Sequence, residues 1–354
     1  MTITINNKNK KTNVPNLRFP EFQGEWEKCK ISDILSIGNG RDYKHLEKGD
    51  IPVFGTGGYM TSVNSYLYDG ETAFIGRKGT INKPYYYKGK FWTVDTLFYT
   101  HLFNGVTPHF VYCLFQTINW LRYNEASGVP SLSKDTIEKI KVHIPQIEEQ
   151  QKISHLLFLL DERIATQSKI IDKLQTLIKG IAHKVSKQGK PNIRLSECLL
   201  CTSSTLQESD VAEVGAYPVY GANGIVGYLD TYNTTSEAIY IIKDGSGVGA
   251  VSCVKGKCSA TGTLNILQTK EGFSLRYLYF ILKVFSFEPY KTGMAIPHIY
   301  FKDYGKAKIY CPSNQLQCKY ADLLSKIEQK ATAEQKILDN LCSQKQYLLC
   351  QMFI

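Results

Sequence analysis

The chain has 354 residues, 43% of them hydrophobic and 21% charged, with a formal net charge of +10 at pH 7. This length allows two or three domains with separate cores, and no apolar run reaches the roughly 18 residues that a membrane-spanning helix needs. Ten cysteines occur without the apolar segment of a secretion signal, so we expect reduced thiols and a cytoplasmic protein. The positive charge favours an anionic partner such as nucleic acid, and it is equally compatible with a soluble basic protein.

The first third of the chain predicts a mixed α/β domain. Short β-branched and aromatic runs alternate with glycine-rich turns there, as strands require. They include IPVFGTGG at Ile51–Gly58 and AFIGRKGT from Ala73. An apolar run of helical length begins at His109, and GVPSLSKDTIEKIKVHIP follows from Gly128 and ends at a proline.

The same elements recur in the same order in the second half. YPVYGANG occupies Tyr217–Gly224, YIIKDGSG begins at Tyr240, and a second apolar run begins at Leu275. A closing segment, GMAIPHIYFKDYGKAKIYCP, again ends at a proline. Corresponding residues lie 166 or 167 positions apart, as Gly79 and Gly245 do. Such a repeat predicts two copies of one domain.

A long amphipathic segment follows each closing proline. In both, steps of four and three residues trace one apolar stripe, which is typical of a coiled-coil seam. The first stripe is Ile153, Leu157, Leu160, Ile164, Gln167, Ile171, Leu174, Ile178, Ile181 and Val185. The second is Tyr320, Leu324, Ile327, Ala331, Glu334, Leu338, Leu341, Lys345, Leu348 and Met352. We expect helices of roughly 50 Å that pair antiparallel with each other, with a polar residue at the same repeat position in each seam. The alternative is that each stripe packs on its own domain.

No motif predicts a catalytic centre. GSGVG at Gly245–Gly249 follows a strand but precedes another strand, which excludes a dinucleotide loop. NKPYY at Asn82–Tyr86 resembles the Asn-Pro-Pro-Tyr motif of DNA amino-methyltransferases, but a lysine replaces the first proline. Four cysteines would suit zinc, but their second pair has the wrong spacing for a zinc ribbon, so we expect no metal. They are Cys198, Cys201, Cys253 and Cys258.

The whole pattern resembles the specificity subunit of type I restriction-modification systems. The resemblance begins at NVPNLRFPEFQGEWEKCKISDI from Asn13 and includes both glycine-rich motifs and both closing segments. It implies an α+β fold with two tandem mixed α/β target-recognition domains, separated by two long antiparallel coiled-coil helices with pseudo-twofold symmetry. The expected boundaries are an N-terminal arm at 1–24, recognition domains at 25–145 and 188–312, and spacer helices at 146–187 and 313–354. The second half lacks the tryptophan of GEWEKCKI, which leaves the start of its domain open.

Candidate DNA contacts lie in the loop after the AFIG strand and at corresponding positions of the second half. Arginine can bond two acceptors of guanine, lysine holds phosphate, and aspartate can accept from the cytosine amino group. In the first half we expect Arg77, Lys78, Lys83, Tyr85, Lys88, Lys90, Ser131, Ser133 and Lys134. In the second we expect Lys243, Asp244, Ser246, Lys255, Lys257, His298, Tyr300 and Lys302.

The resemblance also implies a function. Each domain would read one half of a bipartite, asymmetric site in double-stranded DNA, and the chain itself would perform no chemistry and bind no cofactor. Two methyltransferase subunits would methylate adenine, and two translocase-nuclease subunits would cut unmodified DNA. S-adenosylmethionine, ATP and magnesium would belong to those partners, and no membrane would be involved. The alternatives are a coiled-coil scaffold or RNA-binding module, and a methyltransferase with degenerate motifs.

Overall fold

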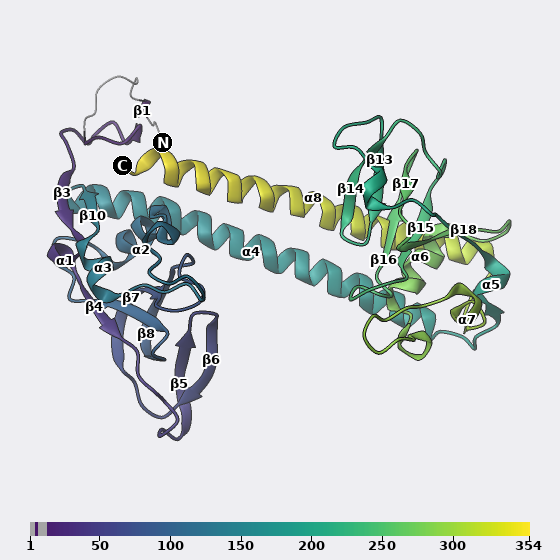
Figure 1. The fold of residues 1–354 in the computed structure, drawn as a ribbon, viewed down its shortest axis with the longest axis horizontal. Coiled ribbons are helices and arrows are strands. Elements are labelled where there is room, and N and C mark those ends of the chain that lie inside the picture. Colours follow the sequence, from purple (N-terminus) through teal and green to yellow (C-terminus); the bar gives the residue numbers. More distant parts are fainter. Residues whose placement is uncertain (1–3, 6–12) are drawn as a thin grey trace. The chain divides into compact units, whose positions relative to one another are not determined.

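A computed structural model describes residues 4–5 and 13–354 (Figure 1). Most of the expected N-terminal arm, residues 1–3 and 6–12, lies outside them. The chain divides into two compact units, residues 1–166 with 337–354, and residues 167–336. We call them unit 1 and unit 2, and each is described by itself. None of the described helices is both long and apolar enough to cross a bilayer.

Unit 1 contains a six-stranded sheet in the order β4-β9-β7-β8-β5-β6, in which only the β5–β8 pair is parallel. Its elements are β1 (Thr4–Ile5), β2 (Leu17–Arg18), β3 (Glu27–Lys30), α1 (Ile31–Ile34), β4 (Ser36–Asn39), β5 (Lys48–Gly55), β6 (Gly58–Val63), β7 (Tyr68–Gly76), β8 (Tyr85–Thr93), β9 (Leu97–His101), α2 (Pro108–Thr117), a 3-10 turn at Trp120–Tyr123, α3 (Lys134–Lys139) and β10 (Lys141–Ile144). The apolar run FWTVDTLFYTHLF, residues 91–103, contains the end of β8, a turn and β9.

Unit 2 repeats this order with a divided sheet. Its elements are β11 (Ile193–Arg194), α5 (Leu195–Cys198), β12 (Leu199–Ser203), a 3-10 turn at Glu208–Asp210, β13 (Tyr217–Gly221), β14 (Gly224–Leu229), β15 (Ala238–Ile242), β16 (Val251–Val254), β17 (Ser259–Ala260), β18 (Leu264–Thr269), α6 (Leu275–Val284), a 3-10 turn at Glu288–Tyr290, α7 (Phe301–Tyr304) and β19 (Lys308–Ile309). Four strands form β12-β18-β15-β16 and three form β14-β13-β17. The counterpart of β8 is interrupted at Gly256, whose φ of +84° takes the chain out of extended geometry.

Two long helices, α4 (Ile147–Ser186) and α8 (Asn314–Met352), contribute to both units. At 1.5 Å per residue the 40 residues of α4 measure about 60 Å. This is longer than the roughly 50 Å expected, because the helix starts at Ile147, before the first residue of the apolar stripe. All residues of both predicted stripes are buried or half-buried. The prediction of two tandem mixed α/β domains joined by long helices is confirmed.

The contacts between these helices run antiparallel within each unit. In unit 1, Lys345 of α8 pairs with Asp161 of α4 at 2.5 Å. In unit 2, the Gln167 amide donates to the carbonyl oxygen of Glu334 at 3.0 Å and to its carboxylate. Both side chains of this second pair are buried, and they occupy the same position of the repeat. The two polar breaks in the stripes therefore satisfy each other and fix the register of the seam.

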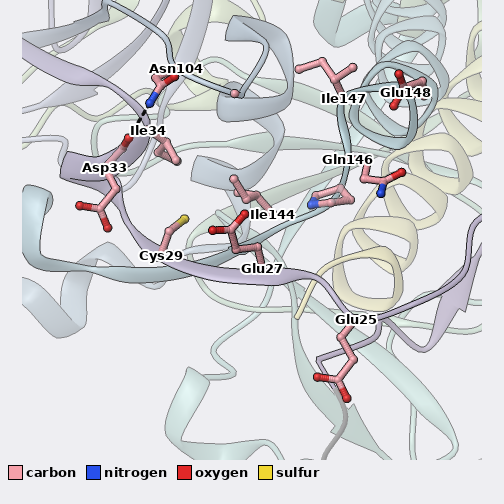
Figure 2. Close-up of a pocket in the computed structure, with 12 residues that line it drawn as sticks. Glu25, Glu27, Cys29, Asp33, Ile34, Asn104, Ile144, Gln146, Ile147 and Glu148 are labelled. Atoms are coloured by element: carbon pink, nitrogen blue, oxygen red, sulfur yellow. Dashed lines mark hydrogen bonds between the residues drawn. The ribbon is translucent and has the colours of Figure 1, made fainter.

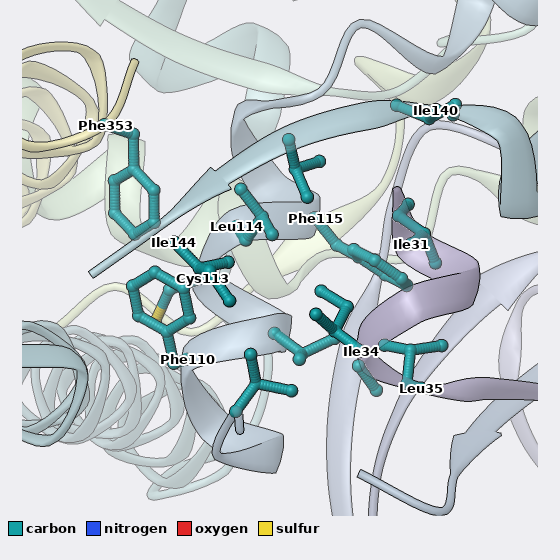
Figure 3. Close-up of a cluster of buried hydrophobic side chains, with 14 of the residues drawn as sticks. Ile31, Ile34, Leu35, Phe110, Cys113, Leu114, Phe115, Ile140, Ile144 and Phe353 are labelled. Atoms are coloured by element: carbon teal, nitrogen blue, oxygen red, sulfur yellow. The ribbon is translucent and has the colours of Figure 1, made fainter. Parts of the chain in front are cut away.

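Two buried contacts tie the start of unit 1 to its helices. The Arg18 guanidinium bonds the Glu149 carboxylate twice, at 2.8 and 2.7 Å. Phe353, directly after α8, stacks on Phe110 of α2 with ring centres 5.4 Å apart (Figure 3). It also meets Trp26 edge-on at 6.0 Å. Unit 2 has no tryptophan at the position matching Trp26, so this aromatic contact belongs to the first half alone.

A cluster of charged and aromatic residues joins each sheet to its helices, and we call it the sheet–helix junction. In unit 2, Arg276 of α6 bridges Glu237, next to β15, at 2.7 Å and Glu328 of α8 at 3.2 Å. The Tyr279 hydroxyl also donates to Glu328, at 2.7 Å. This junction is ionic, with all of its charged side chains partly shielded from water.

In unit 1 the position of Arg276 is taken by His109, 167 residues earlier. Its ring lies 4.9 Å from that of Tyr86, 5.9 Å from that of Tyr112 and 5.2 Å from that of Phe158. Burial lowers the pKa of His109, while the nearby carboxylates of Asp161 and Glu71 partly oppose that shift and Lys345 and His155 add to it. The sheet–helix junction is thus aromatic in unit 1 and ionic in unit 2.

We expect Gln167→Leu to lower the melting temperature by a few degrees, because the Glu334 carboxylate then faces an apolar side chain in the seam and keeps only its ion pair with Lys330. The double change Gln167→Leu with Glu334→Leu should restore it, since both polar groups are then absent. Circular dichroism melting measures this. Gln344→Leu, at an exposed position of α8, is the control and should change little. Equal melting of the single and double variants would contradict the pairing.

We expect Arg276→Gln to destabilise unit 2 by about 1 kcal/mol, since the partly shielded carboxylates of Glu237 and Glu328 lose their shared guanidinium and keep only Lys255 and Lys283. Amide hydrogen exchange resolved along the chain should show faster exchange in α6 and β15 and unchanged exchange in α2. Uniform acceleration in both units would show that the effect is not local to the junction.

The junction of unit 1 should be sensitive to acid. The folded pKa of His109 lies below its unfolded value of 6.5, so its stabilising contribution is complete above about pH 6.5 and is lost as the pH falls. His109→Gln should therefore flatten part of the fall in stability between pH 7.5 and 5, as measured by urea denaturation. An unchanged pH profile would contradict this assignment.

Candidate nucleic-acid interface

Two loops meet in each unit. The strand loops, residues 77–84 in unit 1 and 243–250 in unit 2, connect β7 to β8 and β15 to β16. The helix loops, residues 124–133 and 291–300, lie directly before α3 and α7. They contain most of the residues that the sequence predicts as DNA contacts.

In unit 1 main-chain hydrogen bonds join the two loops. The Gly79 amide donates to the carbonyl of Pro130 at 2.8 Å, and the Leu132 amide donates to the carbonyl of Arg77 at 2.9 Å. Between them, Lys78 and Ser131 form an isolated antiparallel bridge. Gly79 has a φ of +86°, which glycine adopts without strain. The loops therefore hold each other in one conformation.

Unit 2 contains the same main-chain connection between its strand loop and its helix loop, and we call this connection the joint. The Gly245 amide donates to the carbonyl of Pro297 at 3.0 Å, and the Ile299 amide donates to the carbonyl of Lys243 at 2.9 Å. Asp244 and His298 form the bridge, and their side chains also bond at 2.7 Å from Nδ1 to Oδ1. Gly245 again has a positive φ, +94°.

The two joints share a backbone and differ in their side chains. Where unit 1 presents Arg77 and Lys78, unit 2 presents Lys243 and Asp244. The Asp244 side chain is 34% exposed, and one of its carboxylate oxygens bonds His298 while the carboxylate keeps further capacity to accept. Different donors and acceptors on the same frame suit two readers of different base pairs.

Two other predicted contacts, Ser133 and Lys134, lie at the start of α3, where their side chains already bond other residues. Ser133 caps α3: it accepts from the Thr136 amide at 3.2 Å, and its hydroxyl donates to Glu125 at 2.7 Å. Hydrogen bonds from the Thr136 hydroxyl and then from Ser133 hold the pKa of Glu125 below its ordinary value. Lys134 forms an ion pair within α3, with Glu138. Ser133 therefore shapes the loop, while its hydroxyl is already engaged.

On the α7 side, Tyr300 is 47% exposed, and the Lys302 ammonium lies 5.2 Å from the centre of its ring. An aromatic ring and a cation are thus presented together beside the helix loop. Ser246 and Lys83 are exposed within the strand loops. All four are accessible to a ligand.

The structure separates four predicted lysines from the loops. Lys88 and Lys90 lie on β8, where Lys88 pairs with Glu71 at 2.8 Å and lowers the pKa of that carboxyl. In unit 2, Lys257 lies over the ring of Tyr232, at 4.9 Å, and Lys255 lies 3.8 Å from Glu237. All four lysines are exposed, Lys88 and Lys90 on β8 and Lys255 and Lys257 between β16 and β17, outside the strand loops and helix loops.

Tyr85 is placed in an aromatic cluster of unit 1. Its hydroxyl donates to the carbonyl of Gly55 at 2.9 Å, and its ring lies 4.8 Å from that of Phe74. Burial raises its pKa. Most of its interactions therefore stabilise the sheet, which is the alternative role that the sequence leaves open for this residue.

Sequence reasoning missed the apolar residues of the helix loops. Val129 is 66% exposed, Ile296 59%, and Met294 is fully exposed. Val129 and Ile296 occupy the same position of the repeat, each directly before a proline. Comparing exposed positions between the two halves would have found them, but exposure is not visible in the sequence.

A cavity of about 780 Å³ in unit 1 is lined by acidic residues, in contrast to the lysines and arginine of the strand loops (Figure 2). Four carboxylate residues line it, and the Asn104 amide donates to the carbonyl of Asp33 at 3.4 Å. The carboxylate residues are Glu25, Glu27, Asp33 and Glu148. This negative lining disfavours nucleic acid, so the cavity is not part of the candidate interface.

The cysteines that would suit zinc do not converge. Cys198 is buried and its thiol bonds main-chain carbonyls of α5 and the residue before it, while Cys258 bonds the Tyr240 hydroxyl at 3.3 Å. Burial raises the pKa of Cys201 to about 11 and of Cys253 to about 12. Within residues 4–5 and 13–354 no group of three or more histidine, cysteine or acidic side chains could hold a metal ion.

Comparison with known proteins identifies the repeat. The family model described as the type I restriction modification DNA specificity domain matches twice, at residues 23–176 and 198–342. A protein of Mycoplasma pneumoniae assigned as a type I specificity subunit is 22% identical over 344 residues, covering 83% of this chain and 87% of the relative. The specificity subunit of the Escherichia coli type I restriction enzyme EcoprrI is 26% identical over 156 residues, which span 41% of this chain and only 38% of the relative.

Solved structures share the fold. The S subunit of a type I restriction-modification system from M. genitalium superimposes with a TM-score of 0.73 at 19% identity, covering 96% of this chain and 99% of that one. A chain from a structure of type I restriction-modification complex assembly and conformational transition matches with a TM-score of 0.51 at 14% identity, over 92% and 96% of the two chains. Because the two matched segments of the family model cover most of the sequence, this chain belongs to the type I restriction-modification specificity family and carries two copies of its DNA specificity domain.

Proposed function

We propose that this protein is a non-catalytic, sequence-specific DNA-binding subunit that reads a bipartite, asymmetric site. Unit 1 would contact one half of the site and unit 2 the other. The repeated joint between strand loop and helix loop supports this most directly, because one backbone frame is used twice with different side chains. Membership of the specificity family and the net charge of +10 agree with it.

The chemistry of the two joints suggests a division of labour. Arg77 presents a planar guanidinium, which can bond two acceptors of one guanine, whereas Lys78 and Lys243 suit phosphate. Asp244 is an acceptor and would favour the amino group of cytosine or adenine. His298 orients that carboxylate through its 2.7 Å bond. The two half-sites would therefore differ in sequence.

Partner subunits would supply the reactions. We propose that two methyltransferase subunits bind this chain and methylate adenine with S-adenosylmethionine, and that two translocase-nuclease subunits cut unmodified DNA with ATP and magnesium. One structural relative comes from a type I restriction-modification system described in terms of its complex assembly, which supports the existence of such partners. This chain would bind no cofactor and would direct both activities by its choice of site.

A methylome of the host with and without this gene tests the proposal as a whole. We expect one adenine-methylation motif, interrupted by a gap of unspecified bases, to disappear when the gene is deleted and to return with a plasmid copy. Unchanged methylation in a host whose methyltransferase partner is demonstrably active would rule the proposal out.

Replacing residues 25–145 by the matching segment of another family member should change one half of the recognised motif and leave the other intact. The reason is that each unit carries its own pair of joined loops. The motif is read from the methylome, and replacement of residues 188–312 is the reciprocal control. Alteration of both halves by either exchange would contradict separate reading.

Single substitutions should separate base contacts from phosphate contacts. Arg77→Lys should relax the choice of one base pair, reducing discrimination by about 1–3 kcal/mol, because the two-pronged contact is lost. Lys78→Ala should weaken binding to all duplexes and reduce the salt slope by about 0.9. Fluorescence anisotropy at several salt concentrations measures both. Lys319→Ala, an exposed lysine of α8, is the control, and an equal effect there would show that only overall charge matters.

A further inference from the structure

The helix loop of unit 2 folds into a short hairpin with an apolar tip. Thr292 and His298 exchange two main-chain hydrogen bonds, at 2.9 and 2.7 Å, which close the segment between them. Gly293 has a φ of +86°, and a Cβ there would lie 2.4 Å from the carbonyl oxygen of Ile296. The turn is therefore tight, and it presents Met294 and Ile296 to solvent.

Three features make this tip stiff. Ile296 is β-branched and precedes a proline, which restricts both its side chain and its backbone. The carbonyl of Pro297 accepts from Gly245, which ties the tip to the strand loop. The two closing bonds at Thr292 hold its base. A stiff side chain loses little conformational entropy when it is buried by a ligand.

The tip of unit 1 keeps the same plan. Val129 is also β-branched, precedes a proline and is 66% exposed, at the repeat position of Ile296. Pro130 accepts from Gly79 as Pro297 does from Gly245. An exposed aliphatic side chain has no role in the core of either unit. Single exposed aliphatic side chains are ordinary on protein surfaces, and it is the recurrence of one at the same place in both joints that points to contact with a ligand.

The charges around the tips indicate which ligand that is. Lys243 is hydrogen-bonded through its backbone to the residue that follows His298, and Lys302 lies on the first turn of α7. In unit 1, Lys78 bridges to Ser131, two residues from Val129. An exposed aliphatic side chain on joined loops that also carry lysines matches duplex DNA, in which apolar base surfaces lie between two anionic backbones.

We propose that Val129 and Ile296 are specificity residues that make apolar contacts with bases, one in each half of the DNA site, and that Met294 enlarges the contact in unit 2. This inference rests on the proposed DNA-reading function, but that function could hold without any contact from these three residues. Such contacts are made with the methyl group of thymine or, where a side chain enters a base step, with the faces of unstacked bases. They carry sequence information without adding charge.

The experiment starts from duplexes that the unchanged full chain selects from a random library. Ile296→Ala should reduce affinity for the selected duplex roughly 10-fold, the effect of exposing one buried aliphatic side chain, and should leave the salt slope and non-specific binding unchanged. Repeating the selection with this variant should relax one half of the motif, and Val129→Ala should relax the other. Val214→Ala, at a position 86% exposed in unit 2, is the matched control and should bind as the unchanged chain does.

Folding of the variants is checked by thermal melting, and these exposed side chains should be replaceable without loss of stability. Single thymine-to-uracil replacements in the selected duplex should reproduce the loss if a methyl group is contacted. Increased 2-aminopurine fluorescence at one step should accompany binding if the tip enters the stack. Equal affinity and an unchanged motif for Ile296→Ala and Val129→Ala would overturn this inference, whereas failure of the unchanged chain to select any duplex would overturn the proposed function itself.

Discussion

The packing of α4 against α8 is the constraint on which both units depend. Each unit uses a segment of both helices, so neither recognition domain is built from one continuous stretch of chain. Gln167 and Glu334 lie in a seam that is otherwise apolar. A purely apolar seam allows several registers, whereas the hydrogen bond between these two residues forms in one register only. Lys345 has the same effect in unit 1, through Asp161. Register in the seam therefore determines where each sheet meets its helices.

Duplication has left the two units with one architecture and different ways of stabilising it. At the sheet–helix junction, Tyr86, His109 and Phe158 fill the space in unit 1 with rings, and the matching residues of unit 2 are Cys253, Arg276 and Ser325. The smaller cysteine and serine leave room for the guanidinium and its two carboxylates. We expect substitutions at these three positions to be non-additive in their effect on stability within each unit.

Most of the architecture could be predicted from the sequence because two copies of one domain can be compared, and because the apolar residues of both long helices recur at regular steps of four and three. The strand and helix order and the long helices followed from that comparison, whereas the main-chain bonds that join the strand loops to the helix loops did not. The division of the second sheet at Gly256 did not, since the same Lys-Gly-Lys sequence continues as a strand in unit 1. Composition could not separate Lys88 from Lys78 either, because only the strand pairing places Lys88 next to Glu71. The predicted DNA contacts remain predictions.

The hydrogen bonds between the two loops have an evolutionary consequence. Those that join residues 77 to 132, 79 to 130, 243 to 299 and 245 to 297 use only main-chain atoms. The side chains of Lys78, Ser131, Asp244 and His298 can therefore mutate without removing the bonds that hold the loops together. Such a joint lets a lineage acquire a new target preference through a few substitutions while its folding stability is preserved. The side chains that such a domain presents can thus change without rebuilding its fold.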